Sequence, residues 1–120
     1  KNVRLIFMAQ TPTFNTVPFR CADWFNRMNP ICSFGPEMPR EALLRLRKPS
    51  MDSIQTVMQQ TPNTEIWDPF PVLCPPSWEN CRISGEDGLP LFFDGDHISG
   101  HSNDLVYPSF AEQVLQLKPN

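Results

Sequence analysis

Apolar and polar positions alternate in blocks along the chain, and the longer blocks each predict an element. Residues Val3–Ala9 are mostly apolar, which predicts a buried β-strand. From Arg40 to Gln60 apolar residues recur at spacings of three and four, which predicts a helix. A last helix is predicted from Gly100 to Leu117, because one face of it carries Val106, Phe110, Val114 and Leu117.

Shorter blocks lie between the two predicted helices. The stretch "EIWDPF" predicts a short strand that ends at Pro69, and "RISGEDGLPLFF" predicts a hairpin or turn with backbone freedom at Gly85 and Gly88. The resulting order of strand, helix, strand and helix indicates an α/β fold with a parallel sheet.

Prolines interrupt both helical patterns. Pro49 is expected to break or kink the first helix, after which Ser50 or Ser53 could cap a new start. Pro108 is expected to kink the last helix.

Length and charge narrow the class of protein. A chain of 120 residues fits one domain with a modest core. It has 10 basic and 13 acidic residues, which argues against binding to nucleic acid or to an anionic membrane surface. No apolar run approaches the roughly 18 residues that cross a bilayer.

The first predicted strand follows almost directly on Lys1, and the first residues carry neither an initiator methionine nor a signal peptide. We therefore expect it to be a piece of a longer protein, a truncated single domain spanning 1–120. Residues needed for its chemistry could precede Lys1.

The four cysteines form two local pairs, Cys21 with Cys32 and Cys74 with Cys81. Neither pair has the spacing or the histidine neighbours of a zinc site. Each pair encloses an irregular stretch rich in proline and asparagine, so two local disulfides are predicted, and with them an oxidising compartment. The alternative is four free buried thiols in a cytosolic protein.

The stretch "FFDGDHISGH" carries both histidines of the chain. Asp94 and His97 fall on the turn between the last short strand and the last helix, a position that often carries function in α/β proteins. An aspartate three residues before a histidine can accept from its Nδ1 and leave Nε2 facing outward as a base. These two residues would supply two members of a hydrolytic triad.

Other interpretations of this stretch remain open. Asp94, Asp96, His97 and His101 have ligand types suited to a metal, although the Glu of a His-Glu-x-x-His motif is missing. His97 could also be a structural histidine beside aspartates that favour a helix N-terminus. Ser99 is placed to cap that helix rather than to act as a nucleophile.

The segment "GLPLFFDGDHISGHSNDLVYP" resembles the final block of SGNH/GDSL-type hydrolases, whose Asp-x-x-His supplies two members of a Ser-Asp-His triad. More narrowly, "WDPFPVLCPPSWENCRISGEDGLPLFFDGDHIS" and "RLIFMAQTPTFNTVPFRC" are similar to the SGNH domain fused to membrane acyltransferases of the acyltransferase-3 family. The resemblance implies the C-terminal half of a three-layer, flavodoxin-like α/β domain.

The resemblance also implies roles for particular residues. Asp94 would orient His97, and His97 would act as general base and then as general acid, whereas Asp96 has no role in that scheme. The Gly-Asp-Ser block that supplies the nucleophile is missing, so this chain alone is expected to be inactive. None of its serines has a nucleophile motif around it; these are Ser33, Ser50, Ser53, Ser77, Ser84, Ser99, Ser102 and Ser109.

The function implied is an extracytoplasmic acyltransferase or esterase that moves an acyl group, expected to be acetyl, to or from hydroxyls of a cell-surface polysaccharide. Its expected partners are the glycan acceptor and an acyl donor delivered by a membrane acyltransferase domain of the same parent protein. No cofactor and no metal are expected. The location implied is periplasmic or extracellular, tethered to the inner membrane. The alternative is a non-catalytic SGNH-like binding or scaffolding domain.

Overall fold

The computed structural model describes residues 3–15, 24–26, 28–30 and 37–116. The elements in chain order are β1 (Leu5–Met8), the 3-10 helix η1 (Trp24–Asn26), β2 (Glu37–Pro39), α2 (Arg40–Gln60), β3 (Thr64–Trp67), α3 (Phe70–Leu73), β4 (Asn80–Arg82) and α4 (Gly100–Val114).

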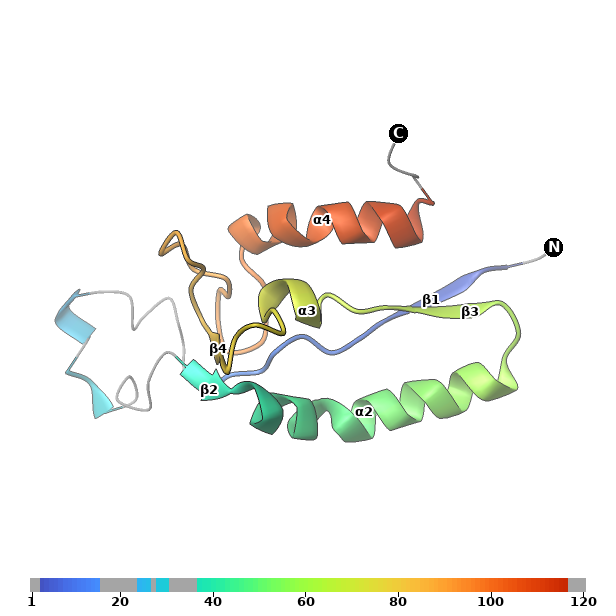
Figure 1. The fold of residues 1–120 in the computed structure, drawn as a ribbon, viewed down its shortest axis with the longest axis horizontal. Coiled ribbons are helices and arrows are strands. Elements are labelled where there is room, and N and C mark those ends of the chain that lie inside the picture. Colours follow the sequence, from blue (N-terminus) through green and yellow to red (C-terminus); the bar gives the residue numbers. More distant parts are fainter. Residues whose placement is uncertain (1–2, 16–23, 27, 31–36, 117–120) are drawn as a thin grey trace.

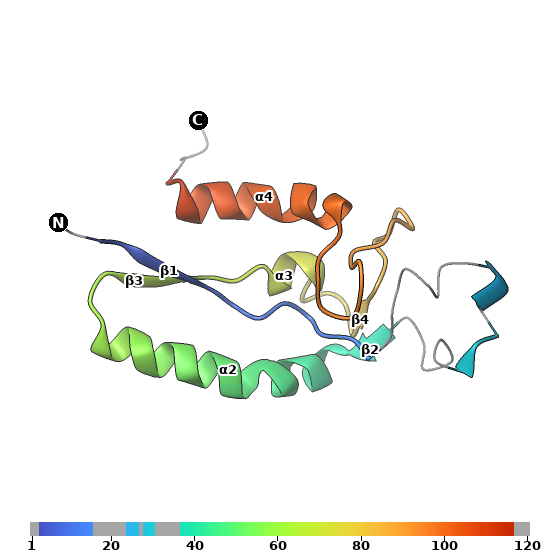
Figure 2. The same cartoon turned by 180° about the vertical axis from the view of Figure 1, so that it is seen from behind.

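Strands β1 and β3 form the predicted parallel pair. Their register runs from Leu5 opposite Thr64 to Met8 opposite Trp67, and the N–H of Ala9 extends the pairing by donating to the Trp67 carbonyl at 2.8 Å. Figures 1 and 2 show α2 on one side of these strands and α4 on the other. Because the strands are parallel and in register, the segments that follow them leave the pair at the same edge.

The prediction that the first strand is buried is wrong in part. The side chains at both ends of β1 are solvent-accessible, with Leu5 42% and Met8 51% exposed. The physical reason is that, among the described residues, β1 pairs with β3 alone and its other edge has no strand beside it.

A second, antiparallel pair of strands was not predicted. Strands β2 and β4 have three residues each, and their sequences carry no clear alternation. Cys81 in β4 forms the predicted disulfide with Cys74, at an S–S distance of 1.98 Å, and both residues are fully buried. The free-thiol alternative is therefore wrong for these two residues, whereas Cys21 and Cys32 lie outside the described residues.

Helix α2 has the predicted bounds, but Pro49 does not break it. The helix continues through the proline for three further turns, so neither Ser50 nor Ser53 begins a new helix. Instead the Ser53 hydroxyl donates to the Pro49 carbonyl at 2.9 Å. Helix α4 likewise continues through Pro108 and ends at Val114.

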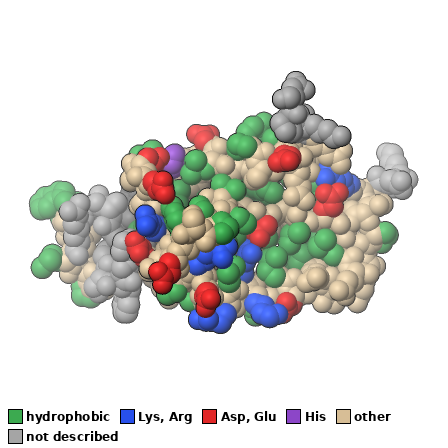
Figure 3. Space-filling view, in the orientation of Figure 1, with side chains coloured by type: hydrophobic (Ala, Val, Ile, Leu, Met, Phe, Trp, Pro, Cys, Tyr) green, Lys and Arg blue, Asp and Glu red, His purple; other side chains and the backbone are tan. Residues whose placement is uncertain are grey.

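The core lies where α2, α3 and α4 meet the ends of the strands. Its largest fully buried side chains include Phe70, Phe92, Leu43 and Leu73. On the face in Figure 3, acidic and basic side chains are interspersed, in keeping with the nearly balanced composition. Within the described part of the chain, no helix is both long and apolar enough to cross a membrane.

Candidate functional site

The Asp94–His97 turn is a closed loop before α4. It follows a hairpin in which Ser84 and Pro90 form an antiparallel bridge. An antiparallel bridge between Phe92 and Ile98 closes its base, and the N–H of Phe93 donates to the His97 carbonyl at 2.8 Å. Since the Phe92 side chain is completely buried, the base of the loop is fixed to the core. The turn precedes the last helix, as predicted, but in place of the predicted short strand before it the structure has only isolated bridges, Ser84 with Pro90 and Phe92 with Ile98.

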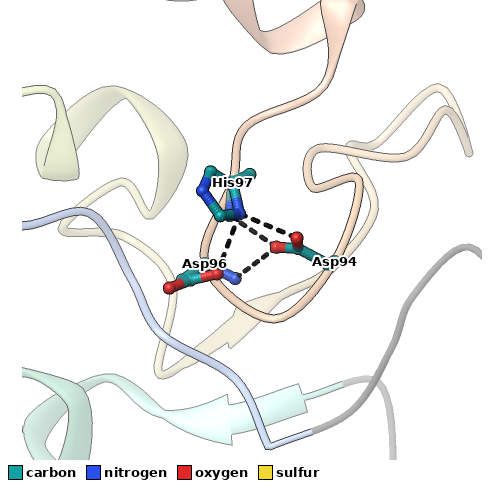
Figure 4. A group of neighbouring side chains, drawn as sticks. All are labelled: Asp94, Asp96 and His97. Atoms are coloured by element: carbon teal, nitrogen blue, oxygen red, sulfur yellow. Dashed lines mark hydrogen bonds and ion pairs between the residues drawn. The ribbon is translucent and has the colours of Figure 1, made fainter.

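The Asp94 carboxylate organises the loop through both of its oxygens. Oδ1 accepts the backbone N–H groups of Asp96 at 3.0 Å and of His97 at 2.8 Å, and Oδ2 lies 2.7 Å from Nδ1 of His97 (Figure 4). An ionised carboxylate can only accept, so Nδ1 is the protonated ring nitrogen and Nε2 is the acceptor of a neutral His97.

The imidazole is accessible from outside. The His97 side chain is 76% exposed, and in Figure 4 its second ring nitrogen points away from both carboxylates. This is the arrangement expected of a base that receives a proton from a group above the loop.

Electrostatics favour the charged form of both partners. The two backbone N–H groups, from Asp96 first and His97 second, hold the pKa of the Asp94 carboxyl well below its usual range. The hydrogen bond to Asp94 raises the pKa of His97, and the negative charges of Asp94 and Asp96 raise it further.

Asp96 contributes a second carboxylate that the sequence analysis left without a role. Its Oδ1 lies 3.1 Å from Nδ1 of His97, so two acidic groups face the same ring nitrogen. The signal in the sequence was the second aspartate of Asp-Gly-Asp-His, but only the conformation of the turn brings its side chain back to the ring.

Three of the four candidate metal ligands lie close together in the structure. Ligand atoms of Asp94, Asp96 and His97 lie within 4.8 Å of one another, a spacing that could hold a cation. His101 is not among them, because its Nε2 lies 3.0 Å from Oδ2 of Asp87. A metal on Nδ1 of His97 would also replace the 2.7 Å bond to Asp94.

Ser99 caps α4, as predicted. Its Oγ accepts the N–H of Ser102 at 3.1 Å and donates to the Pro90 carbonyl at 2.6 Å. Among the described residues no serine hydroxyl is hydrogen-bonded to His97, and Ser33 lies outside them. The part of the chain that the structure describes therefore places a histidine and its carboxylate together without a serine nucleophile.

Comparison with known protein families matches residues 1–112 to the SGNH domain, in the form described as fused to AT3 domains. The chain belongs to this family. The match covers both strands of the parallel pair and the whole Asp94–His97 turn, and it supports an α/β fold and an acyl-related hydrolase or transferase context for this SGNH domain. No curated protein and no solved structure matches the chain.

Proposed function

We propose that this SGNH domain is the extracytoplasmic part of an enzyme that transfers an acyl group, by preference acetyl, to or from hydroxyls of a cell-surface polysaccharide. The observation that carries the proposal is the 2.7 Å contact between Oδ2 of Asp94 and Nδ1 of His97, with the other ring nitrogen turned outward. That pair is the orienting and proton-transferring part of a Ser-His-Asp mechanism.

The proposed reaction has two halves. A serine hydroxyl supplied by residues upstream of Lys1 attacks the carbonyl of the acyl donor, while Nε2 of His97 takes its proton. His97 then returns that proton to the leaving group, and the acyl group remains on the serine as an ester. In the second half His97 removes a proton from the acceptor hydroxyl, which attacks the ester and releases the serine. A sugar acceptor makes the enzyme a transferase, and water makes it an esterase.

The domain context supports the location and partners that we propose. The buried Cys74–Cys81 disulfide is typical of an oxidising compartment, such as the periplasm or the cell exterior. The family description pairs this domain with AT3 domains, which supports a parent protein whose membrane acyltransferase part delivers the donor. We further propose that the β1–β3 pair belongs to a wider three-layer, flavodoxin-like sheet of the complete domain.

The test is glycan acylation by the longer protein that carries this domain. His97→Ala should abolish acylation, by about 10⁴-fold or more, because the serine loses its base. The matched control is His101→Ala, since the His101 ring pairs with Asp87 instead of with Asp94. Acylation that survives His97→Ala at normal expression would rule out the catalytic assignment and favour a binding or scaffolding role.

A further inference from the structure

Two backbone carbonyls of the Asp94–His97 turn accept hydrogen bonds from a segment far away in the sequence. The hydroxyl of Thr11 donates to the Asp96 carbonyl at 3.2 Å, and the N–H of Phe14 donates to the Gly95 carbonyl at 2.6 Å. The Phe14 ring packs on Phe92 at a centroid distance of 5.0 Å. The 9–14 segment that follows β1 therefore hydrogen-bonds to both residues that lie between Asp94 and His97, which are Gly95 and Asp96.

This 9–14 segment leaves the strand pair beside Asp68, the residue that follows β3. Both oxygens of Asp68 accept from the guanidinium of Arg47, each at 2.9 Å, and Oδ1 also accepts the N–H of Phe70 at 3.0 Å. The same guanidinium donates to the Gln10 carbonyl at 3.4 Å and lies 4.2 Å above the Phe70 ring. Arg47 thus ties α2, the end of β3 and the start of the 9–14 segment together.

Burial separates Arg47 from its neighbour on the same helix. The Arg47 side chain is only 13% exposed, whereas Arg45 is 73% exposed and approaches Glu41 at 3.7 Å, a solvated pair. A planar, two-pronged contact to a carboxylate is a geometry that lysine does not reproduce. The run Arg45, Arg47 and Lys48 is therefore not one uniformly solvated face, because Arg47 alone is largely buried.

We propose that Thr11 and Arg47 are positioning residues for the Asp94–His97 pair. The turn is short and exposed. Within it, the Asp94 carboxylate accepts the backbone N–H groups of Asp96 and His97, whereas the carbonyls of Gly95 and Asp96 are bonded from the 9–14 segment. Thr11 bonds to the turn directly, and Arg47 acts through the 9–14 segment. The positioning itself stands on geometry, and only its catalytic consequence rests on the proposed function.

The direct test is an NMR titration of His97 in the full 120-residue chain. Thr11→Val keeps the shape of the side chain and removes the donor, so the turn should loosen and the proton affinity of His97 should fall about threefold, roughly half a pKa unit. Thr11→Ser keeps the donor and should titrate like the native chain. Thr56→Val is the matched control, because the Thr56 hydroxyl donates to the Asp52 carbonyl on α2, outside this network.

Arg47→Lys tests the indirect contact in the same way, with Arg45→Lys as its control on the same helix. We expect Arg47→Lys to lower the proton affinity of His97 and Arg45→Lys to leave it unchanged. An unchanged His97 titration in both Thr11→Val and Arg47→Lys would overturn the inference. If the unfolding midpoints alone shift, the two residues support the fold in general and do not position His97.

The catalytic consequence is measured separately in the longer protein. Thr11→Val should lower kcat for acyl transfer without raising KM, because Thr11 contacts the turn rather than the substrate. Failure of the proposed function would appear as activity that survives His97→Ala, and failure of the positioning inference would appear in the titration, so the two are distinguishable.

Discussion

Asp94 holds His97 at two points: one carboxylate oxygen accepts the backbone N–H of His97 at 2.8 Å, and the other lies 2.7 Å from its ring nitrogen Nδ1. The backbone bond fixes the position of the residue, and the ring bond fixes the orientation of the imidazole and its tautomer. Asp94 alone therefore fixes both the position and the ring orientation of His97.

Asp94→Asn should lower the pKa of His97 toward its ordinary value of about 6.5. The asparagine can still accept the backbone N–H groups through its oxygen, but the charge that favours the imidazolium is lost. NMR titration of His97 measures this change. Asp87→Asn is the control, and should leave the titration of His97 as it is, since Asp87 pairs with His101. Equal titration of His97 in the native and Asp94→Asn chains would contradict the assigned hydrogen bond.

The same pair has a defined effect on stability against pH. Because the pKa of His97 is raised in the folded chain, its contribution is fully present below the unfolded value of about 6.5 and is lost as the pH rises through the folded pKa. The pKa of Asp94 is lowered, so its contribution is present above about 3.9 and is lost on further acidification. Urea unfolding across pH should show both changes in the native chain. In Asp94→Ala the change from Asp94 should be absent and the change from His97 smaller, since the charge of Asp96 still faces the ring.

Gly88 and Gly100 offer a matched pair of glycine substitutions. Gly88 has a φ of 79° with open space around it, so Gly88→Ala should destabilise the fold by about 1–2 kcal/mol through backbone conformation alone. Gly100 is the first residue of α4 and also has open space, so Gly100→Ala should be neutral or stabilising by up to about 1 kcal/mol. Denaturant unfolding measures both changes. A larger loss of stability in Gly100→Ala than in Gly88→Ala would contradict the positive φ assigned to Gly88.

The Cys74–Cys81 bridge closes a loop with a sequence separation of seven. Replacing both residues by alanine should cost about 2–3 kcal/mol, from the entropy that the unfolded chain regains. The double substitution is preferable to a reducing agent, since a reductant would also act on the disulfide that the sequence predicts between Cys21 and Cys32. An unfolding midpoint equal to that of the native chain would show that the local loop is held by packing alone.

Ser99→Ala should destabilise the chain by about 1–2 kcal/mol, because Ser99 both caps α4 and bonds to the Pro90 carbonyl. Ser53→Ala is the control, since its hydroxyl bonds an exposed carbonyl within α2, and its effect should stay within about 0.5 kcal/mol. Thermal unfolding reports both. A loss of acyl transfer in the longer protein without a loss of stability would instead indicate a direct role for the Ser99 hydroxyl.

The elements that the sequence predicted well are those with a local physical cause. The helix over Arg40–Gln60 follows from its apolar spacing, and the cap at Ser99 follows from residue type and position. Of the break or kink expected at Pro49, the break does not occur, because a proline removes one backbone bond and packing of the remaining helix can outweigh that loss. Strands β2 and β4 were missed because three residues carry too little pattern to be seen without their partner.

The sequence by itself predicted the contact between Asp94 and His97, since a spacing of three residues on one turn lets the carboxylate reach the imidazole. It also determined the local disulfide, because Cys74 and Cys81 are close in the chain. Only the tertiary structure decided that Asp96 faces the same ring nitrogen, that Thr11 hydrogen-bonds to the turn and that Arg47 hydrogen-bonds to the 9–14 segment. The contacts of Thr11 with Asp96 and of Arg47 with Gln10 join residues 85 and 37 positions apart. Such pairs leave no periodic signal in a single sequence, because their proximity depends on the packing of every element between them.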